Sequence, residues 1–382
     1  MVLHNIFFNA SATIKKSVVG FVLVSLCGCV SLGTTPGIGK KVEFSALPGW
    51  ESDSVRSVWP ALKKNCIVQR KKASWSGICS DIERIQNPSE SEVREFIYSW
   101  FEPHQVNGKN AKAEGLITGY YEPLLKGSEV KTERFKYPLY SQPKDLLIVD
   151  LAELYPDLKG KRVRGRIEGN RVVPYYSRKQ IDSEPELLSG EELLWVDSRD
   201  DAFFLHIQGS GRVELPTGDI KRVGYANQNG HPYYAIGRYL IDQNYVRRED
   251  ISLFTIRQWL RENPQQAEEL LHKNPSYVFF ALSDADRDGP KGSMGIPLTA
   301  ERSIAIDPKF VELGTLVWLD TTYPSDDEPP YQRLVVAQDT GGAIRGAVRA
   351  DLFWGRGDRA ELNAGEMKQR GKLFVLLPRA PK

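Results

Sequence analysis

The chain reads Val-Val-Ala-Gln-Asp-Thr-Gly-Gly-Ala-Ile-Arg-Gly over residues 335–346 and Ala-Asp-Leu-Phe-Trp-Gly over residues 350–355. The first stretch is an apolar run that delivers Asp339 to a glycine turn, and the second places Asp351 at the end of another apolar run. Short apolar runs bounded by glycine are typical of buried strands, so we expect the two carboxylates to meet at adjacent strand ends. A carboxyl in such surroundings has a raised pKa and holds a proton near neutral pH, which outlines an acid–base site.

These aspartates also have structural interpretations. An Asp before Thr-Gly-Gly is good turn chemistry, and Asp358 precedes a stretch in which it would serve as a helix N-cap. The triplet Asp339-Thr340-Gly341 further occurs in the catalytic loops of aspartic proteases, which need two such loops. The sequence contains no second Asp-Thr-Gly or Asp-Ser-Gly, so only a dimeric protease would satisfy that alternative.

The rest of the chain predicts a strand-rich protein with helices. Residues 45–101 have helical periodicity, with a capping box at residues 89–92 and an apolar stripe of Val93, Phe96, Ile97 and Trp100. Helical periodicity returns over residues 231–271, with a break at Asn263-Pro264, and residues 213–223 form a hairpin pattern. Many short strands with Gly and Pro between them favour a barrel. The other strand-length runs are 116–121, 171–176, 193–196, 277–282, 303–306, 315–319, 334–337, 347–350 and 373–377.

Composition excludes several classes of function. The 382 residues carry 51 Lys and Arg against 49 Asp and Glu, a net charge of +2, and no clustered basic stripe, so we expect no nucleic-acid partner. The sequence has five scattered histidines, no Cys-x-x-Cys and no His-Glu-x-x-His, so we expect no metal and no cofactor.

The N-terminus has the pattern of an export signal. Lys15 and Lys16 precede an apolar segment, residues 18–26, which is shorter than the roughly 20 residues needed to span a bilayer. Its ending, Leu26-Cys27-Gly28-Cys29, resembles a bacterial lipoprotein signal; plain secretion is the alternative. The resemblance implies that residues 1–28 are removed, that Cys29 is lipidated and sorted to the periplasmic face of the outer membrane, and that residues 29–44 are a tether.

Two cysteines remain in the predicted mature chain. Cys66 and Cys79 lie thirteen residues apart, and an oxidising compartment permits a disulfide between them. Two buried, reduced thiols would fit the sequence equally well, so both states stay open.

Several ordered motifs resemble one family of bacterial cell-wall enzymes. Residues 295–319 and 338–346, with Asp307, Asp339 and Asp351, resemble the three-aspartate (3D) domain of cell-wall proteins. Three further segments resemble signatures of the membrane-bound lytic murein transglycosylase A family: Thr-Gly-Tyr-Tyr-Glu-Pro (118–123), His-Ile-Gln-Gly-Ser-Gly-Arg-Val (206–213) and the segment 224–233. Read alone, the tyrosines would be ordinary strand aromatics and the glycines a bulge or turn.

The resemblance implies a mainly β fold with some α structure. A double-psi β-barrel would be assembled from residues 45–123 and 274–382, with a smaller β-domain at residues 124–273 inserted and a substrate groove between them. The implied reaction is lytic cleavage of the β-1,4 bond between N-acetylmuramic acid and N-acetylglucosamine, which leaves a 1,6-anhydro sugar. Asp351 would be the single general acid and base and Asp339 its support. Substrate-binding candidates carried over from the motifs are Thr118, Tyr120, Gln208, Ser210, Asp307 and Asp358.

The expected partners follow from the same resemblance: peptidoglycan glycan strands, a lipid anchor in the outer membrane and other cell-wall enzymes, with the protein itself a monomer. A non-catalytic peptidoglycan-binding lipoprotein is the main alternative. Retention of both Asp339 and Asp351 argues against it, because a binding module has little need of a carboxyl that must be kept protonated.

Overall fold

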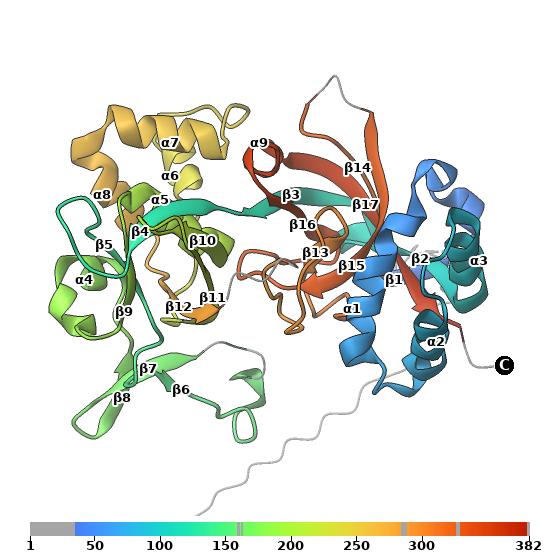
Figure 1. The fold of residues 1–382 in the computed structure, drawn as a ribbon, viewed down its shortest axis with the longest axis horizontal. Helices are drawn as coiled ribbons and strands as arrows, with labels where there is room; N and C mark the ends of the chain where they lie inside the picture. Colours follow the sequence, from blue (N-terminus) through green and yellow to red (C-terminus); the bar gives the residue numbers. More distant parts are fainter. Residues whose placement is uncertain (1–34, 159–160, 162, 284–288, 326–328, 380–382) are drawn as a thin grey trace, which may run out of the picture. The chain divides into compact units, whose positions relative to one another are not determined.

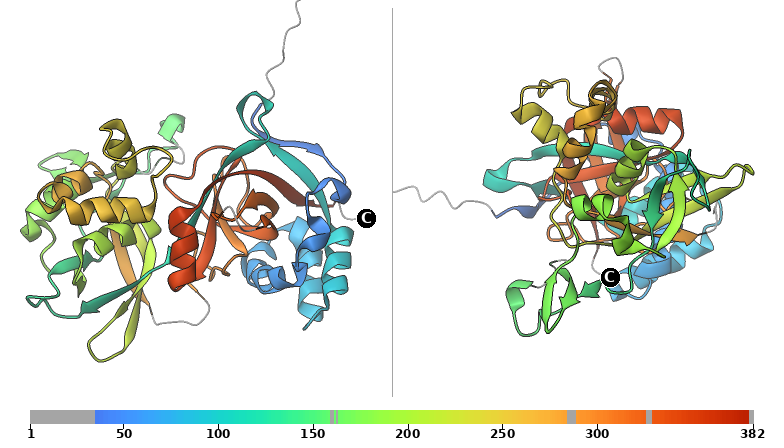
Figure 2. Two further views of the ribbon diagram at one scale, coloured as in Figure 1. Left: turned by 90° about the horizontal axis from the view of Figure 1, so that it is seen from above. Right: turned by 90° about the vertical axis from the view of Figure 1, so that its left-hand side faces the viewer.

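Three β-sheets with flanking helices make up the protein (Figures 1 and 2). The computed structural model describes residues 35–158, 161, 163–283, 289–325 and 329–379, and Thr34–Lys382 forms one compact unit. Cys29 and the predicted signal lie outside the described residues. None of the helices in the described part is long and apolar enough to cross a bilayer.

The largest sheet closes into a barrel. Its order is β1-β2-β17-β14-β15-β13-β16-β3, and an additional pairing of β17 with β3 joins β17, β14, β15, β13, β16 and β3 into a ring. The strands are β1 (Gly37–Lys41), β2 (Phe101–Asn107), β3 (Glu114–Glu122), β13 (Ser303–Ile306), β14 (Leu316–Thr322), β15 (Pro330–Asp339), β16 (Arg349–Arg356) and β17 (Lys368–Pro378). β1 lies within the segment predicted as a tether and pairs antiparallel with β2, so residues 37–41 belong to the folded body.

The barrel strands read as continuous apolar runs because both of their faces are buried. In β14, Val317 and Leu319 belong to the cluster inside the barrel, whereas Leu316 and Trp318 belong to a second cluster on its outer side. Side chains alternate between the faces of a strand, so one apolar run supplies both cores. The predicted runs 303–306, 334–337 and 373–377 fall within these strands, and the run 315–319 begins one residue before β14, which confirms all four as strands.

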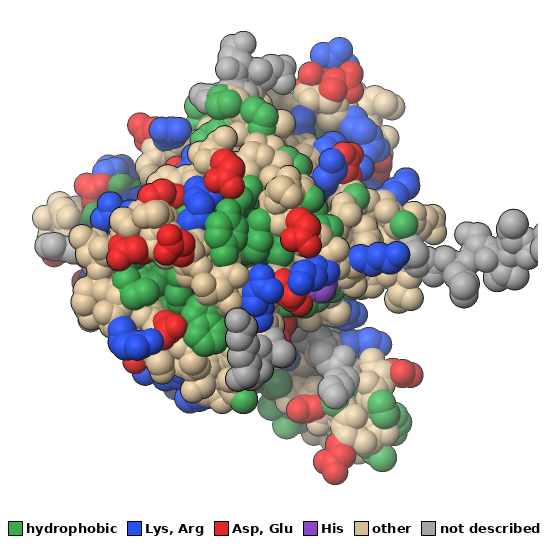
Figure 3. Space-filling model, turned by 90° about the vertical axis from the view of Figure 1, so that its right-hand side faces the viewer, with side chains coloured by type: hydrophobic (Ala, Val, Ile, Leu, Met, Phe, Trp, Pro, Cys, Tyr) green, Lys and Arg blue, Asp and Glu red, His purple; other side chains and the backbone are tan. Residues whose placement is uncertain are grey.

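The outer cluster is closed by the predicted helical region, which forms α1 (Trp59–Gln69), α2 (Ala73–Arg84) and α3 (Glu90–Trp100). The capping box is present: the Ser89 side chain accepts from the Glu92 N–H, and the Glu92 carboxylate accepts from the Ser89 N–H. Trp50 packs edge-on against Trp318 with ring centroids 5.0 Å apart, which joins this segment to β14. On the face in Figure 3, charged side chains of both signs are interspersed, as the balanced composition predicts.

A disulfide joins Cys66 of α1 to Cys79 of α2, which decides between the two states left open by the sequence. We expect the double variant Cys66→Ala/Cys79→Ala to lose about 2–3 kcal/mol of unfolding free energy, because the bridge restricts the unfolded chain. Urea denaturation with and without reductant measures the loss. If reductant leaves the midpoint of the wild-type protein unchanged, this expectation is wrong.

The second sheet has the order β12-β11-β10-β4-β9-β5. Its strands are β4 (Leu124–Ser128), β5 (Tyr137–Tyr140), β9 (Glu192–Val196), β10 (Ser210–Glu214), β11 (Ile220–Gln228) and β12 (Val278–Ser283). The antiparallel pair β10–β11 confirms the predicted hairpin. The chain passes from β3 of the barrel to β4 across Pro123, close to the predicted boundary, but β12 carries this sheet beyond residue 273.

Helices surround the second sheet, and a third sheet of three strands precedes α4. These elements are α4 (Arg178–Ser183), α5 (Arg199–Gln208), α6 (Ile236–Asp242), α7 (Leu253–Glu262), α8 (Pro264–His272), β6 (Leu147–Ile148), β7 (Arg164–Glu168) and β8 (Arg171–Pro174). α7 ends and α8 begins on either side of Asn263, which confirms the predicted break. No helix was predicted over α5, because Gly209 and Gly211, which follow it, indicate only a bulge or a turn.

Candidate active site

Asp351 lies in the middle of a row of side chains that crosses four barrel strands. β13 is paired parallel with β15 and antiparallel with β16, and its Ala305 is the pairing partner of both Asp339 and Asp351. Asp351 is in turn paired with Thr118 of β3. The backbones of Asp339 and Asp351 are therefore two strand spacings apart, about 9–10 Å. The small side chain of Ala305 lies between the two carboxylates. The prediction of adjacent strand ends was wrong, because β13, which precedes both aspartates in the chain, inserts between their strands.

The Asp351 carboxylate is held by a short hydrogen bond across strands. The Thr118 hydroxyl donates to Oδ1 of Asp351 over 2.5 Å. Gly119, the next residue, allows β3 to approach closely on the other side, since a Cβ there would lie 2.5 Å from Nε1 of Trp354. The Thr-Gly-Tyr motif thus packs one face of β3 tightly and turns Thr118 and Tyr120 toward the aspartates.

Arg349 orients this hydrogen bond. It lies two residues before Asp351 on the same face of β16, and its Nη2 donates to the Thr118 hydroxyl over 2.9 Å. Nη1 donates to the carbonyl oxygens of Ala350 and Leu116, which fixes the guanidinium. Because Thr118 accepts from Arg349, its single hydroxyl hydrogen is directed to Oδ1 of Asp351, and a proton on the Asp351 carboxyl belongs on Oδ2.

Burial raises the pKa of Asp351 above the usual range of an aspartate, and this is the largest effect on it. The positive charge of Arg349 and the Thr118 hydrogen bond act in the opposite direction, and the charge of Asp339 raises the pKa further. A proton on Asp351 is thus favoured mainly by desolvation, while Arg349 keeps the carboxyl able to release it.

Asp339 is engaged by four hydrogen-bond donors. Its Oδ1 accepts from the N–H and hydroxyl of Ser293 and from the Thr340 N–H, each over 2.8 Å, and its Oδ2 accepts from the Tyr120 hydroxyl over 2.9 Å. Burial, the largest effect, raises the pKa of Asp339, and these bonds lower it. Tyr120 is 8% exposed, and its ring packs at a tilt against that of Phe353, with the centroids 5.2 Å apart, so a buried side chain donates to Asp339.

The second sheet contributes polar side chains from the predicted motifs. The Gln208 side chain, at the end of α5, accepts from the Tyr121 N–H over 3.0 Å, which places it next to β3. Ser210 begins β10 and is part-buried. Tyr233, the last residue of the motif 224–233, is not among the predicted site residues. Tyr233 is 40% exposed, and partial desolvation together with the charge of Asp351 raises its pKa.

Two further candidates lie apart from this row. Asp307 is 3% exposed, and its oxygens accept from the N–H groups of Lys309 and Gly346, which is the bonding of a residue that organises a loop. Asp358 is exposed and is the first residue of α9 (Asp358–Glu366), whose N-cap is Gly357. The predicted capping role was therefore wrong by one position, although a carboxylate in a first helical turn is favourable. Among the described residues, no group of three or more His, Cys, Asp or Glu side chains could hold a metal ion.

Comparison with known proteins agrees with this arrangement. The profile of the MltA specific insert domain matches residues 116–281, and that of the 3D domain matches residues 302–377. Membrane-bound lytic murein transglycosylase A of Vibrio cholerae is 32% identical over 280 residues, which span 71% of this chain and 68% of that protein.

Solved structures share the fold. A membrane-bound lytic murein transglycosylase from Agrobacterium tumefaciens is 31% identical, with a TM-score of 0.79 over 90% of this chain and 98% of that chain. MltA of Escherichia coli with bound chitohexaose is 24% identical, with a TM-score of 0.66 over 91% of this chain and 95% of that chain. The predicted architecture, a double-psi β-barrel with an inserted domain, is confirmed. From its barrel, its insert and its relatives, the chain belongs to the membrane-bound lytic murein transglycosylase A family.

Proposed function

We propose that the protein cleaves the β-1,4 bond between N-acetylmuramic acid and N-acetylglucosamine in peptidoglycan and forms 1,6-anhydro-N-acetylmuramic acid. The observation that carries the proposal is the carboxyl of Asp351, which has a raised pKa and, unlike Asp339, keeps one oxygen free of hydrogen-bond donors among the described residues. The names of the relatives support a lytic activity on murein. The glycan would lie across Asp351 and Thr118, with Gln208 and Ser210 of the insert on its other side.

The chemistry requires only one such group. Asp351 donates its proton to the glycosidic oxygen as the C1–O4 bond breaks. The resulting carboxylate then accepts the proton of the sugar's own 6-hydroxyl as O6 bonds to C1, so no water is consumed. Intramolecular attack has effective molarities that reach about 10⁵ M or more, which outcompetes water. Ordinary glycosidases use a second carboxylate, but Asp339 is already occupied by four donors.

Mass spectrometry of the soluble products from murein sacculi tests the proposal. We expect muropeptides that are lighter by one water than the products of hydrolysis, and no ¹⁸O uptake when the reaction runs in H₂¹⁸O. Reducing-end products carrying ¹⁸O would make the protein a hydrolase. Binding to sacculi without release of any product would favour the non-catalytic lipoprotein.

Arg349 gives a prediction for pH dependence. Since its charge lowers the pKa of Asp351, we expect Arg349→Met to raise that pKa. The acid works while protonated, so the alkaline limb of the kcat/KM profile should move to higher pH, and kcat should fall because Thr118 is no longer oriented. Arg349→Lys, which keeps the charge, should return the limb toward its original position. An alkaline limb that stays in place or moves to lower pH in Arg349→Met would contradict this role.

The location of the protein is also a proposal. The lipoprotein-like ending at Cys29 and the membrane-bound relatives support a lipid anchor at the periplasmic face of the outer membrane. A Cys29→Ser variant should then appear in the soluble periplasmic fraction.

A further inference from the structure

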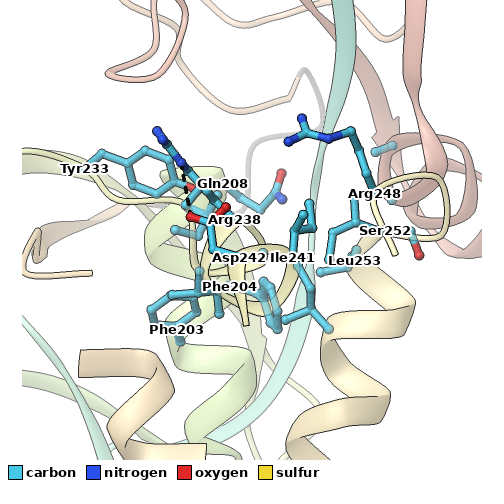
Figure 4. A pocket seen from close by; sticks show the side chains of 18 residues that line it. Phe203, Phe204, Gln208, Tyr233, Arg238, Ile241, Asp242, Arg248, Ser252 and Leu253 are labelled. Atoms are coloured by element: carbon cyan, nitrogen blue, oxygen red, sulfur yellow. Dashed lines mark ion pairs between the residues drawn. The ribbon is translucent and has the colours of Figure 1, made fainter. Parts of the chain in front are cut away.

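A cavity of about 630 Å³ lies among the helices of the insert, next to the site described above (Figure 4). We call it the helical pocket. Its walls come from α5, α6 and α7 and from the end of α9. The apolar side chains that form most of the wall are Phe203, Phe204, Ile207, Ile236, Ile241, Ile251, Leu253 and Ile256.

The apolar wall is a poor match for a sugar ring. A buried hydroxyl without a hydrogen-bond partner costs free energy, and each ring of a glycan brings several. The polar side chains that line the pocket are Gln208, Tyr233, Arg238, Asp242, Arg248 and Ser252, and Figure 4 shows Gln208, Tyr233, Arg238 and Arg248 at one side of the apolar side chains. A ligand with small apolar groups for the apolar wall and a few charged groups for the polar side would fit the pocket better than a saccharide.

The position of the pocket indicates which part of the substrate would reach it. Gln208 lines the pocket and accepts from the Tyr121 N–H of β3, the strand that carries Thr118. Ala364 of α9 also lines it and lies against Gly119 of the same strand. In peptidoglycan, the N-acetylmuramic acid residue carries a short peptide on its lactyl group, beside the bond that is cut. The acetamido groups of the sugars are far smaller than the pocket, so the peptide is the substituent of suitable size and chemistry.

The charge at the mouth agrees with an anionic peptide. Arg248 is exposed and forms no hydrogen bond or ion pair within the described part of the chain. Arg238 is paired only loosely with Asp242, at 3.6 Å, on the same exposed surface. The stem peptide carries carboxylates, and a bidentate guanidinium is the side chain best suited to bind them.

We propose that the helical pocket binds the peptide stem of the N-acetylmuramic acid residue at the cleavage site, with its side chains against the apolar wall and a carboxylate on Arg248. This inference rests on the proposed function. It makes the enzyme selective for peptide-bearing glycan over naked glycan, through groups that take no part in the bond cleavage.

The test compares two substrates: peptide-bearing glycan strands, and the same strands after an amidase has removed the peptides. The readout is the ratio of the two kcat/KM values for anhydro product. Arg248→Gln removes the cation, and Ala235→Trp fills the pocket from the exposed N-cap of α6. We expect each to lower the ratio about tenfold, a loss typical of one or two good contacts.

Matched controls are Arg247→Gln, whose arginine pairs with Glu249 and Asp250 outside the pocket, and Ala73→Trp, at the exposed start of α2. Neither should change the ratio. The inference is overturned if Arg248→Gln and Ala235→Trp leave the ratio unchanged, including the case in which both substrates slow equally. Failure of the proposed function is a separate result: wild-type protein that forms no anhydro product from either substrate.

Discussion

Asp351→Asn should lower the rate of anhydro-product formation about 10³-fold or more while glycan binding persists. The amide has the size of the carboxyl, and its oxygen still accepts the Thr118 hydrogen bond. It neither gives a proton to the glycosidic oxygen nor takes one from the 6-hydroxyl, so both proton transfers are lost. Product release from sacculi measures the first effect, and co-sedimentation with sacculi measures the second.

The control for this variant is Asp219→Asn, the same exchange in the exposed turn of the β10–β11 hairpin. It should retain wild-type activity. Near-normal turnover by Asp351→Asn would remove Asp351 from the mechanism and turn attention to Asp339. Loss of binding together with turnover would instead make Asp351 a residue that holds the glycan.

The strands around the site were predictable because burial on both faces leaves a strong signal in the sequence. The run 334–337 lies inside β15, where Val335 and Ala337 face the barrel and Leu334 and Val336 face the helices. Burial of this kind is a local property that a pattern of apolar residues records directly.

The geometry of the carboxylates was not predictable from spacing. Asp339 and Asp351 are twelve residues apart in the chain, but Ala305 of an earlier strand separates them in space. Strand order depends on how distant segments cross, and a periodic pattern carries no record of that. Arg349 was not among the predicted site residues. Its position two residues before Asp351 indicates the same face of a strand, so the sequence alone could have placed it beside Asp351.

Arg302 ties the N-terminal segment to the barrel immediately before β13. Its guanidinium forms a bidentate pair with Asp53, both bonds 2.8 Å long, and the two side chains are 3% exposed. It also donates to the carbonyl oxygens of Leu334 and Ser54, and the Leu334 N–H donates to Asp53. These hydrogen bonds join three parts of the chain: Asp53 and Ser54 of the N-terminal segment, Arg302 before β13, and Leu334 of β15.

Arg302→Met should lower the free energy of unfolding by about 3–5 kcal/mol, because it leaves the Asp53 carboxylate buried without a counter-charge. Urea denaturation measures the loss. The double variant Asp53→Leu/Arg302→Met removes both charges and should recover a large part of the stability, whereas a double variant as unstable as the single one would show that packing, not the unpaired charge, causes the loss. Since β13 begins next to Arg302 and places Ala305 between Asp339 and Asp351, the single variant should also lose activity at temperatures where it remains folded.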